Sequence, residues 1–167
     1  LDPAADGLAG ASVAEGVTGL DGSMRALAIP VSEGGPFVIV SEGGIDISTS
    51  RAPVVPVLRT LLVREDPAPS QPVYATPLTT LVLELASLVA DLEVGLYRGN
   101  GDGAVTREEL LDAVEVAEAM VREAFGLGLL DDANLFTSPP LLLRSAETQA
   151  EQDGALAHRV AVEAFTA

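Results

Sequence analysis

The residue types best suited to chemistry lie in residues 98–109, with the sequence RGNGDGAVTREE. Side-chain oxygens alternate with glycines there, because Asn100 and Asp102 are two positions apart and Glu109 follows in the same segment. Calcium prefers oxygen ligands, including a backbone carbonyl such as that of Ala104, and glycine lets a short loop reverse so that the oxygens converge. The segment therefore predicts a calcium-binding loop that uses Asn100, Asp102, Ala104 and Glu109.

This segment aligns with the twelve-residue loop of an EF-hand, except at the first position. Gly103 falls at the sixth position, where a sharp turn is required, and Glu109 falls at the twelfth, where a bidentate carboxylate completes the site. The first position holds Arg98, where an aspartate normally anchors the ion. A metal site here needs a replacement ligand, and Asp91, Glu93 or a water are the candidates. Spacing alone does not choose among them.

A metal-free reading of the same residues stays open. Thr106 and Glu109 have the spacing of a capping box at the start of a helix, in which each side chain bonds the backbone N–H of the other residue. Asn-Gly-Asp-Gly is also good turn chemistry between two helices. The loop is therefore either a weak calcium site or a connection that has kept only the shape of one.

Most catalytic chemistries lack their side chains in this sequence. The chain has no Cys and no Lys, so cysteine nucleophiles, thiolate metal sites, disulfides, Schiff bases and a phosphate-loop lysine are all excluded. His158 is the single histidine, and we expect it on the solvated face of a helix. A triad or a histidine zinc site needs more than this. We expect no enzymatic activity and no catalytic residue.

The charge balance narrows the class of partner. The chain has 25 acidic and nine basic residues, which gives a net charge of −16. Such a surface repels nucleic acid and anionic membranes. No apolar run approaches the roughly 20 residues that a membrane span needs. The sequence starts at Leu1 rather than Met, and we expect either a removed leader or a segment of a longer protein.

The elements that position the loop change character along the chain. Alternating apolar residues and glycine turns predict short strands at 23–31, 37–41, 45–47 and 54–64, with Pro30 and Pro56 at strand ends or edges. Helical periodicity then begins at Thr76, a good N-cap before a proline. We expect helices from Thr76 to about Gly95, from Thr106 to about Gly126, and over about 146–165. The third should turn Leu156, Val160, Ala164 and Phe165 inward.

These elements predict an α+β fold. We expect an antiparallel β-sandwich domain over residues 1–65, a proline-rich linker over 66–75, and a three-helix region over 76–167 that carries the loop at 98–109.

Several segments resemble modules of large bacterial surface proteins of the adhesin or RTX type. Residues 6–13 and 21–23 are similar to the opening of the transthyretin-like, carboxypeptidase-regulatory β-sandwich, and residues 43–49 and 75–81 (ATPLTTL) look like the turn and helix start of such modules. The resemblance covers about residues 6–130. It implies a surface location and a structural use, without supplying a ligand. The loop also resembles half of a dockerin, whose second loop has no counterpart here.

The sequence thus predicts a secreted or cell-surface structural module. Its expected partners are copies of itself or neighbouring domains of a surface protein, with residues 1–17 or the FVIV strand as contacts. The alternative is a calcium-dependent, dockerin-like module that binds a different protein.

Overall fold

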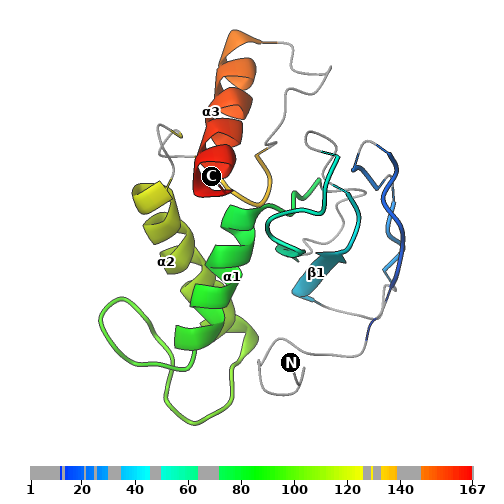
Figure 1. Ribbon diagram of the computed structural model, residues 1–167. Helices are drawn as coiled ribbons and strands as arrows, with labels where there is room; N and C mark the ends of the chain where they lie inside the picture. The colour runs from blue at the N-terminus through cyan, green and yellow to red at the C-terminus, as the bar shows by residue number, and fades with distance from the viewer. Residues whose placement is uncertain are drawn as a thin grey trace.

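The computed structural model describes residues 12, 14–20, 22–24, 26–29, 35–45, 50–63, 72–125, 129, 133–138 and 148–166. These form one β-hairpin followed by three helices, as Figure 1 shows. The strands are β1 (Phe37–Glu42) and β2 (Val57–Leu62), and the helices are α1 (Pro77–Val89), α2 (Arg107–Phe125) and α3 (Gln149–Thr166). The predicted α+β class is confirmed.

The hairpin is antiparallel, and its register pairs Phe37 with Leu62 and Glu42 with Val57. Both strands were predicted from their β-branched and leucine residues. Pro56 directly precedes β2, where its missing N–H disturbs no strand pairing, as the sequence analysis required. Ile45 lies just beyond β1 and is not in a strand, while most of the predicted strand at 45–47 and Pro30 fall outside the described residues.

The predicted β-sandwich is wrong. Within the described residues there is one two-stranded sheet, and residues 23, 24 and 26–29 of the predicted first strand have no strand partner. A sandwich needs two sheets with facing apolar surfaces. Residues 12–29 offer few large side chains, and Val17 and Leu20 among them are fully or almost fully exposed. The apolar surface that covers the hairpin comes from helices instead.

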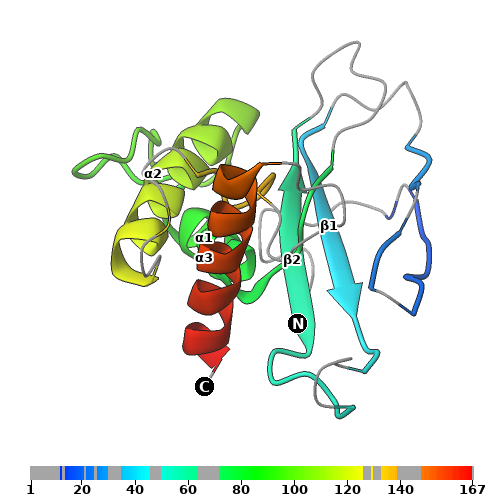
Figure 2. The ribbon, with the colours of Figure 1, turned by 90° about the horizontal axis from the view of Figure 1, so that it is seen from above.

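The hydrophobic core lies between β2 and the helices. Figure 2 shows β1 and β2 side by side, with the helices on the β2 side and residues 12–29 on the β1 side. Leu61 of β2 joins the apolar cluster that Leu78, Val82 and Leu83 of α1 form, and each of these three is fully buried. Residues 66–71 of the predicted linker lie outside the described residues, so the division into domains stays a prediction.

Helix α1 starts where the sequence placed it and ends earlier. Thr76 is the N-cap and Pro77 the first residue, but the helix stops at Val89 rather than near Gly95. The three- and four-residue spacing of its apolar residues predicts an inward stripe of Leu78, Leu81, Val82, Leu85, Leu88, Val89 and Leu92. The buried face differs from this stripe, since Leu88 is 74% exposed while Thr79 and Ala86 are buried. A helix that is apolar nearly all round does not reveal its inward face by spacing alone.

Two threonine hydroxyls fasten α1 to the outer edge of β2. The Arg59 N–H donates to Thr80 Oγ1 at 2.8 Å, and Thr79 Oγ1 donates to the Arg59 carbonyl at 2.7 Å. Thr76 Oγ1 also accepts the Thr79 N–H at 3.1 Å, and Thr79 Oγ1 accepts the Thr76 N–H at 2.9 Å. Both backbone groups of Arg59 that face away from β1 are therefore satisfied by the first turn of the helix. We call Thr76, Thr79, Thr80 and Arg59 the threonine joint.

The joint should make Thr79 far more sensitive to substitution than a surface threonine. Thr79→Val keeps the shape but leaves the Arg59 carbonyl and the Thr76 N–H buried without partners, so we expect a loss of about 2 to 3 kcal/mol in the free energy of unfolding. Urea denaturation measures it. Thr18→Val, at an exposed threonine, is the control and should change stability by less than about 0.5 kcal/mol. Equal effects of the two variants would contradict this role.

Candidate functional site

The loop between α1 and α2 closes on itself near its start. After α1 the chain leaves at Leu92 and returns at Gly99, whose N–H donates to the Leu92 carbonyl at 3.0 Å. The Gly101 N–H donates to the Asp91 carbonyl at 2.7 Å. Figure 1 shows the two lobes that result, one before and one after this crossing. Asp91 is thereby brought against residues 99–101, which are remote from it in sequence.

Gly99 makes the crossing possible because it has no side chain. A Cβ atom there would lie 2.2 Å from the carbonyl carbon of Asp91 and 2.3 Å from the Ala90 oxygen, both backbone atoms that cannot swing away. Gly101 and Gly103 then carry positive φ angles of 71° and 83°, which glycine adopts without strain. The Asn-Gly-Asp-Gly sequence predicted a turn at residues 100–103, but nothing in it indicated the close approach at Gly99.

Asp91, one of the candidates to replace the ligand missing at Arg98, is bonded to the loop. Its Oδ2 accepts the Gly103 N–H at 3.0 Å, which ties the carboxylate to the turn residue of the loop. Its Oδ1 is buried and has no hydrogen-bond partner in the described part of the chain. Glu93, the other upstream candidate, is exposed, and Arg98 is exposed as well. Tertiary structure therefore distinguishes two acids that spacing could not.

Asn100, Asp102 and Ala104 form consecutive turns around the tip of the loop. Asn100 Oδ1 accepts the Asp102 N–H at 2.9 Å, and Asp102 Oδ1 accepts the Ala104 N–H at 2.8 Å. These are Asx turns, in which a short polar side chain replaces a backbone acceptor. All three residues are exposed. Their turn chemistry accounts for their presence without a metal, as the metal-free reading anticipated.

Glu109 joins the loop to the start of α2. Its Oε2 accepts the Thr106 N–H at 2.8 Å while Thr106 Oγ1 accepts the Glu109 N–H at 3.2 Å, which completes the capping box. Its Oε1 accepts the Asn100 N–H at 3.0 Å. The bond from Thr106 is the main cause that holds the pKa of Glu109 below its ordinary value. Both carboxylate oxygens are thus already engaged by backbone donors.

The loop collects the predicted residues but does not assemble them as a finished metal site. Among the described residues, no three Asp, Glu or His side chains are grouped so that they could hold a metal ion. Asp91, Asp102 and Glu109 each bond a different N–H group instead. The arrangement is an oxygen-rich loop in which one buried carboxylate oxygen, Asp91 Oδ1, is left without a partner.

His158 does not lie on a solvated surface, so that expectation is wrong. The residue is fully buried, and α3 turns Ala155, His158 and Ala161 inward in place of the predicted Leu156 and Val160, which are about half exposed. The i, i+3 spacing of these three buried residues was visible in the sequence. A stripe of alanines and one polar residue has little apolar contrast with the rest of the helix, so its spacing alone does not mark it as the inward face.

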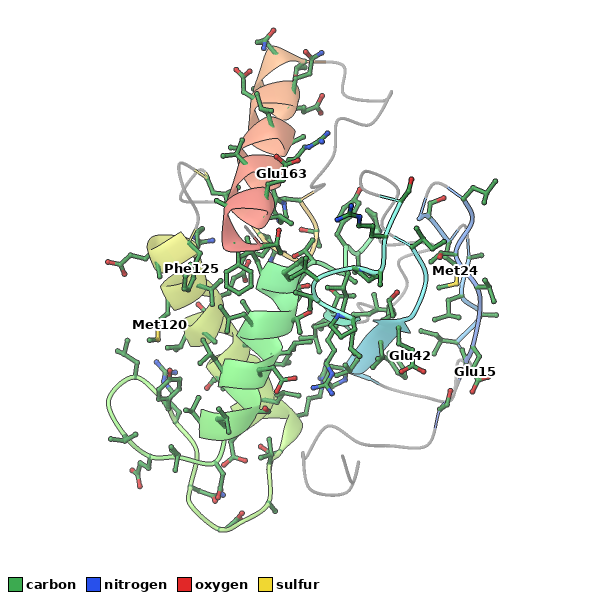
Figure 3. The ribbon with its side chains drawn as sticks, viewed as in Figure 1. Glu15, Met24, Glu42, Met120, Phe125 and Glu163 are labelled. Atoms are coloured by element: carbon green, nitrogen blue, oxygen red, sulfur yellow. The ribbon has the colours of Figure 1, made fainter. Side chains whose placement is uncertain are left out.

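An apolar hollow of about 410 Å³ lies between the ends of α2 and α3. Ala124, Phe125, Ala164 and Phe165 line it, and the two phenylalanine rings meet edge to face with centroids 5.3 Å apart. Phe125 is labelled in Figure 3. The four described residues that line this hollow are all apolar.

Comparisons with known proteins do not assign the chain to a family. No family model matches it, and neither does any curated protein or solved structure. Within the described segments, none of the helices is both long enough and apolar enough to cross a membrane.

The crossing at Gly99 predicts opposite effects for two Gly→Ala substitutions. Gly99→Ala should destabilise the protein by more than about 2 kcal/mol, because the added Cβ forces the backbone at Asp91 apart. Gly154→Ala, in the interior of α3 with open space around it, should stabilise by about 0.5 to 1 kcal/mol through helix propensity. Thermal unfolding of the two variants measures both. Similar signs for the two would show that the crossing does not constrain the loop.

Proposed function

We propose that the chain is a non-enzymatic structural module of a secreted or cell-surface bacterial protein, an adhesin or a fibre, and that it associates with copies of itself or with neighbouring domains. The observation that carries the proposal is the difference between the two edges of the hairpin. The threonine joint closes the outer edge of β2. Within the described residues, no backbone hydrogen bond reaches the outer edge of β1.

The residues around this open edge favour contact with another chain. Val40, near the end of β1, is 52% exposed, and Ile45, just after it, is 69% exposed. The described residues between 12 and 29 lie on the β1 side of the hairpin (Figure 2). Exposed edges pair readily with other strands unless something blocks them. An apolar edge on an otherwise acidic module suits an assembly contact.

Several carboxylates accept hydrogen bonds from backbone N–H groups, and these structural roles support the non-enzymatic part of the proposal. Asp91 and Glu109 accept backbone N–H groups in the loop, and Glu118 of α2 accepts the Leu135 N–H at 2.6 Å. Burial raises the pKa of Glu118, but its partner is a backbone amide in a connecting segment rather than a group in a cleft. These carboxylates have structural roles that account for their presence.

Self-association should depend on salt and on the β1 edge. At a net charge of −16, copies repel one another, so added salt should promote assembly by screening that repulsion. We expect the mass from light scattering to rise between about 0.02 M and about 0.5 M NaCl. Val40→Glu, which adds a charge at the open edge, should suppress the rise.

Two controls make this result specific. Val54→Glu adds the same charge at a valine that is 79% exposed and outside both strands, and it should leave the salt response unchanged. Removal of residues 1–17 tests the other contact that the sequence offered. A wild-type chain that stays monomeric at every salt concentration would contradict assembly through copies of itself, as would equal effects of the two glutamate variants.

The carboxylate of Asp91 favours a second candidate function. In this function the chain is a calcium-dependent module that binds a different protein in the manner of a dockerin. Its buried and unpartnered Oδ1 adjoins the loop that carries Asn100, Asp102 and Glu109. A buried carboxylate oxygen without a partner is costly, and a bound cation would remove that cost. Calcium would draw Asp102 and Glu109 from their backbone donors toward a shared ion. Binding should therefore be weak, because these bonds must be given up.

This second candidate predicts a calcium effect that depends on Asp91. Calcium at ten times its Kd should stabilise the wild-type chain by about 1.4 kcal/mol through mass action. Asp91→Asn should abolish this shift, and Glu109→Gln should reduce it. Glu93→Gln is the matched control, since Glu93 is the exposed acid nearby. Calorimetry with calcium and with EDTA makes the comparison. The absence of a calcium shift in the wild-type chain would leave the metal-free loop.

A further inference from the structure

Helix α3 rests on the remainder of the protein through a narrow stripe of small residues. Its buried residues are Ala155, His158 and Ala161, and Val162 and Phe165 pack partly against the same apolar cluster. Figure 1 shows the C-terminal half of α3 beside the start of α1 and the end of α2. Alanines bury little area, so each adds little to the docking of the helix. The ring of His158, which is 0% exposed, is the largest fully buried side chain of α3.

The surroundings of this ring suit only its neutral form. Neither Nδ1 nor Nε2 has a hydrogen-bond partner in the described part of the chain. Burial lowers the pKa of His158 from its ordinary 6.5, and the backbone of Ser138 opposes this effect without outweighing it. A protonated ring would carry two N–H donors and a charge into an apolar contact, which is far more costly than a neutral ring there.

Several charged groups on the elements around α3 are engaged elsewhere. Glu118 of α2 accepts the Leu135 N–H, and Arg122 donates to the Ala133 carbonyl at 2.6 Å. Glu84 of α1 pairs with Arg59, and Arg159 of α3 itself pairs with Glu163 at 2.7 Å. None of them is among the causes that set the pKa of His158. Within the described residues, no carboxylate is bonded to either ring nitrogen of His158.

The hairpin and α1 lack a comparable sensitivity. Their contact is held by the hydroxyls of Thr76, Thr79 and Thr80 and by the backbone of Arg59, none of which titrates near neutral pH. The apolar residues of α1 and α2 do not titrate at all. The one histidine of the chain thus lies at the contact of α3, which is also the contact made by the smallest side chains.

We infer that α3 is an acid-released helix. On acidification His158 takes up a proton, α3 leaves α1 and α2, and the apolar surface that Ala161, Val162 and Phe165 cover becomes accessible, while the threonine joint keeps the hairpin on α1. The inference does not depend on either function proposed above, because it concerns a contact remote from β1 and from the loop.

The direction of the pH dependence follows from the lowered pKa of His158. With α3 released, the ring titrates near 6.5, and with α3 docked it titrates at a lower pH. The released state binds the proton more tightly, so docking is unaffected above pH 6.5 and weakens as the pH falls below it. The weakening is at most tenfold per pH unit, which gives an upper limit of about 30-fold at pH 5.0. It stops growing below the pKa of the docked state.

Hydrogen exchange of each helix, read by mass spectrometry at about pH 7.5 and about pH 5.0, tests the inference. After correction for intrinsic exchange rates, peptides from 149–166 should lose protection by up to about 30-fold at the lower pH. Peptides from 77–89 should keep theirs. The single histidine also gives one imidazole NMR signal, which should titrate below 6.5. Unchanged α3 protection, an equal loss in α1 and α3, or a ring that titrates at 6.5 in the folded protein would each overturn the inference.

Two variants separate the ring's charge from its bulk. His158→Leu keeps an apolar side chain of similar size, and its α3 should exchange alike at both pH values. The double variant His158→Leu with Val160→His moves the only imidazole to a half-exposed position on the same helix. The relocated ring should titrate near 6.5 without affecting α3. Acid release that persists in either variant would show that another group is responsible. If these variants fail to fold, the wild-type measurements still decide the question.

Discussion

The hydrogen bonds between the first turn of α1 and the edge of β2 are the constraint on which the arrangement of the molecule depends. A two-stranded hairpin is marginal by itself, and an unpaired strand edge exposes backbone groups that need partners. Thr79 and Thr80 supply those partners at Arg59, from a helix whose own capping box uses Thr76. The hydroxyls of Thr76 and Thr79 therefore start the helix, while those of Thr79 and Thr80 satisfy the backbone of Arg59 and fix the helix against the sheet.

The position of the loop follows from this joint. Because α1 begins at β2 and ends at Val89, its last turn carries Asp91 away from the sheet to the far end of the helical layer. The crossing at Gly99 then turns the chain so that α2 can return beside α1. Asp91 bonds the Gly103 N–H only because the ends of the excursion from Leu92 to Gly99 meet. The geometry of the candidate site is a result of how two helices are connected.

The sequence predicted the elements of the fold better than their inward faces. Strand β1, the N-cap at Thr76 and the capping box at Thr106 were all evident, because turn residues, caps and short β-branched runs act locally. The inward faces of α1 and α3 were misassigned. An almost uniformly apolar helix and an alanine-rich one both lack a clear contrast between faces, so packing with neighbours decided the outcome, as it did for His158.

The sequence by itself determined that the chain has no cysteine or lysine chemistry and that it is strongly acidic. It also determined that the strands precede the helices, and that Asn100 and Asp102 lie in the loop whose following helix begins with Glu109 in its first turn. Tertiary structure alone decided that helices rather than a second sheet cover the hairpin and that Asp91 rather than Glu93 meets the loop. Composition and caps act through neighbours in the chain. The choice between two acids, or between two faces of a helix, depends on groups that only folding brings together.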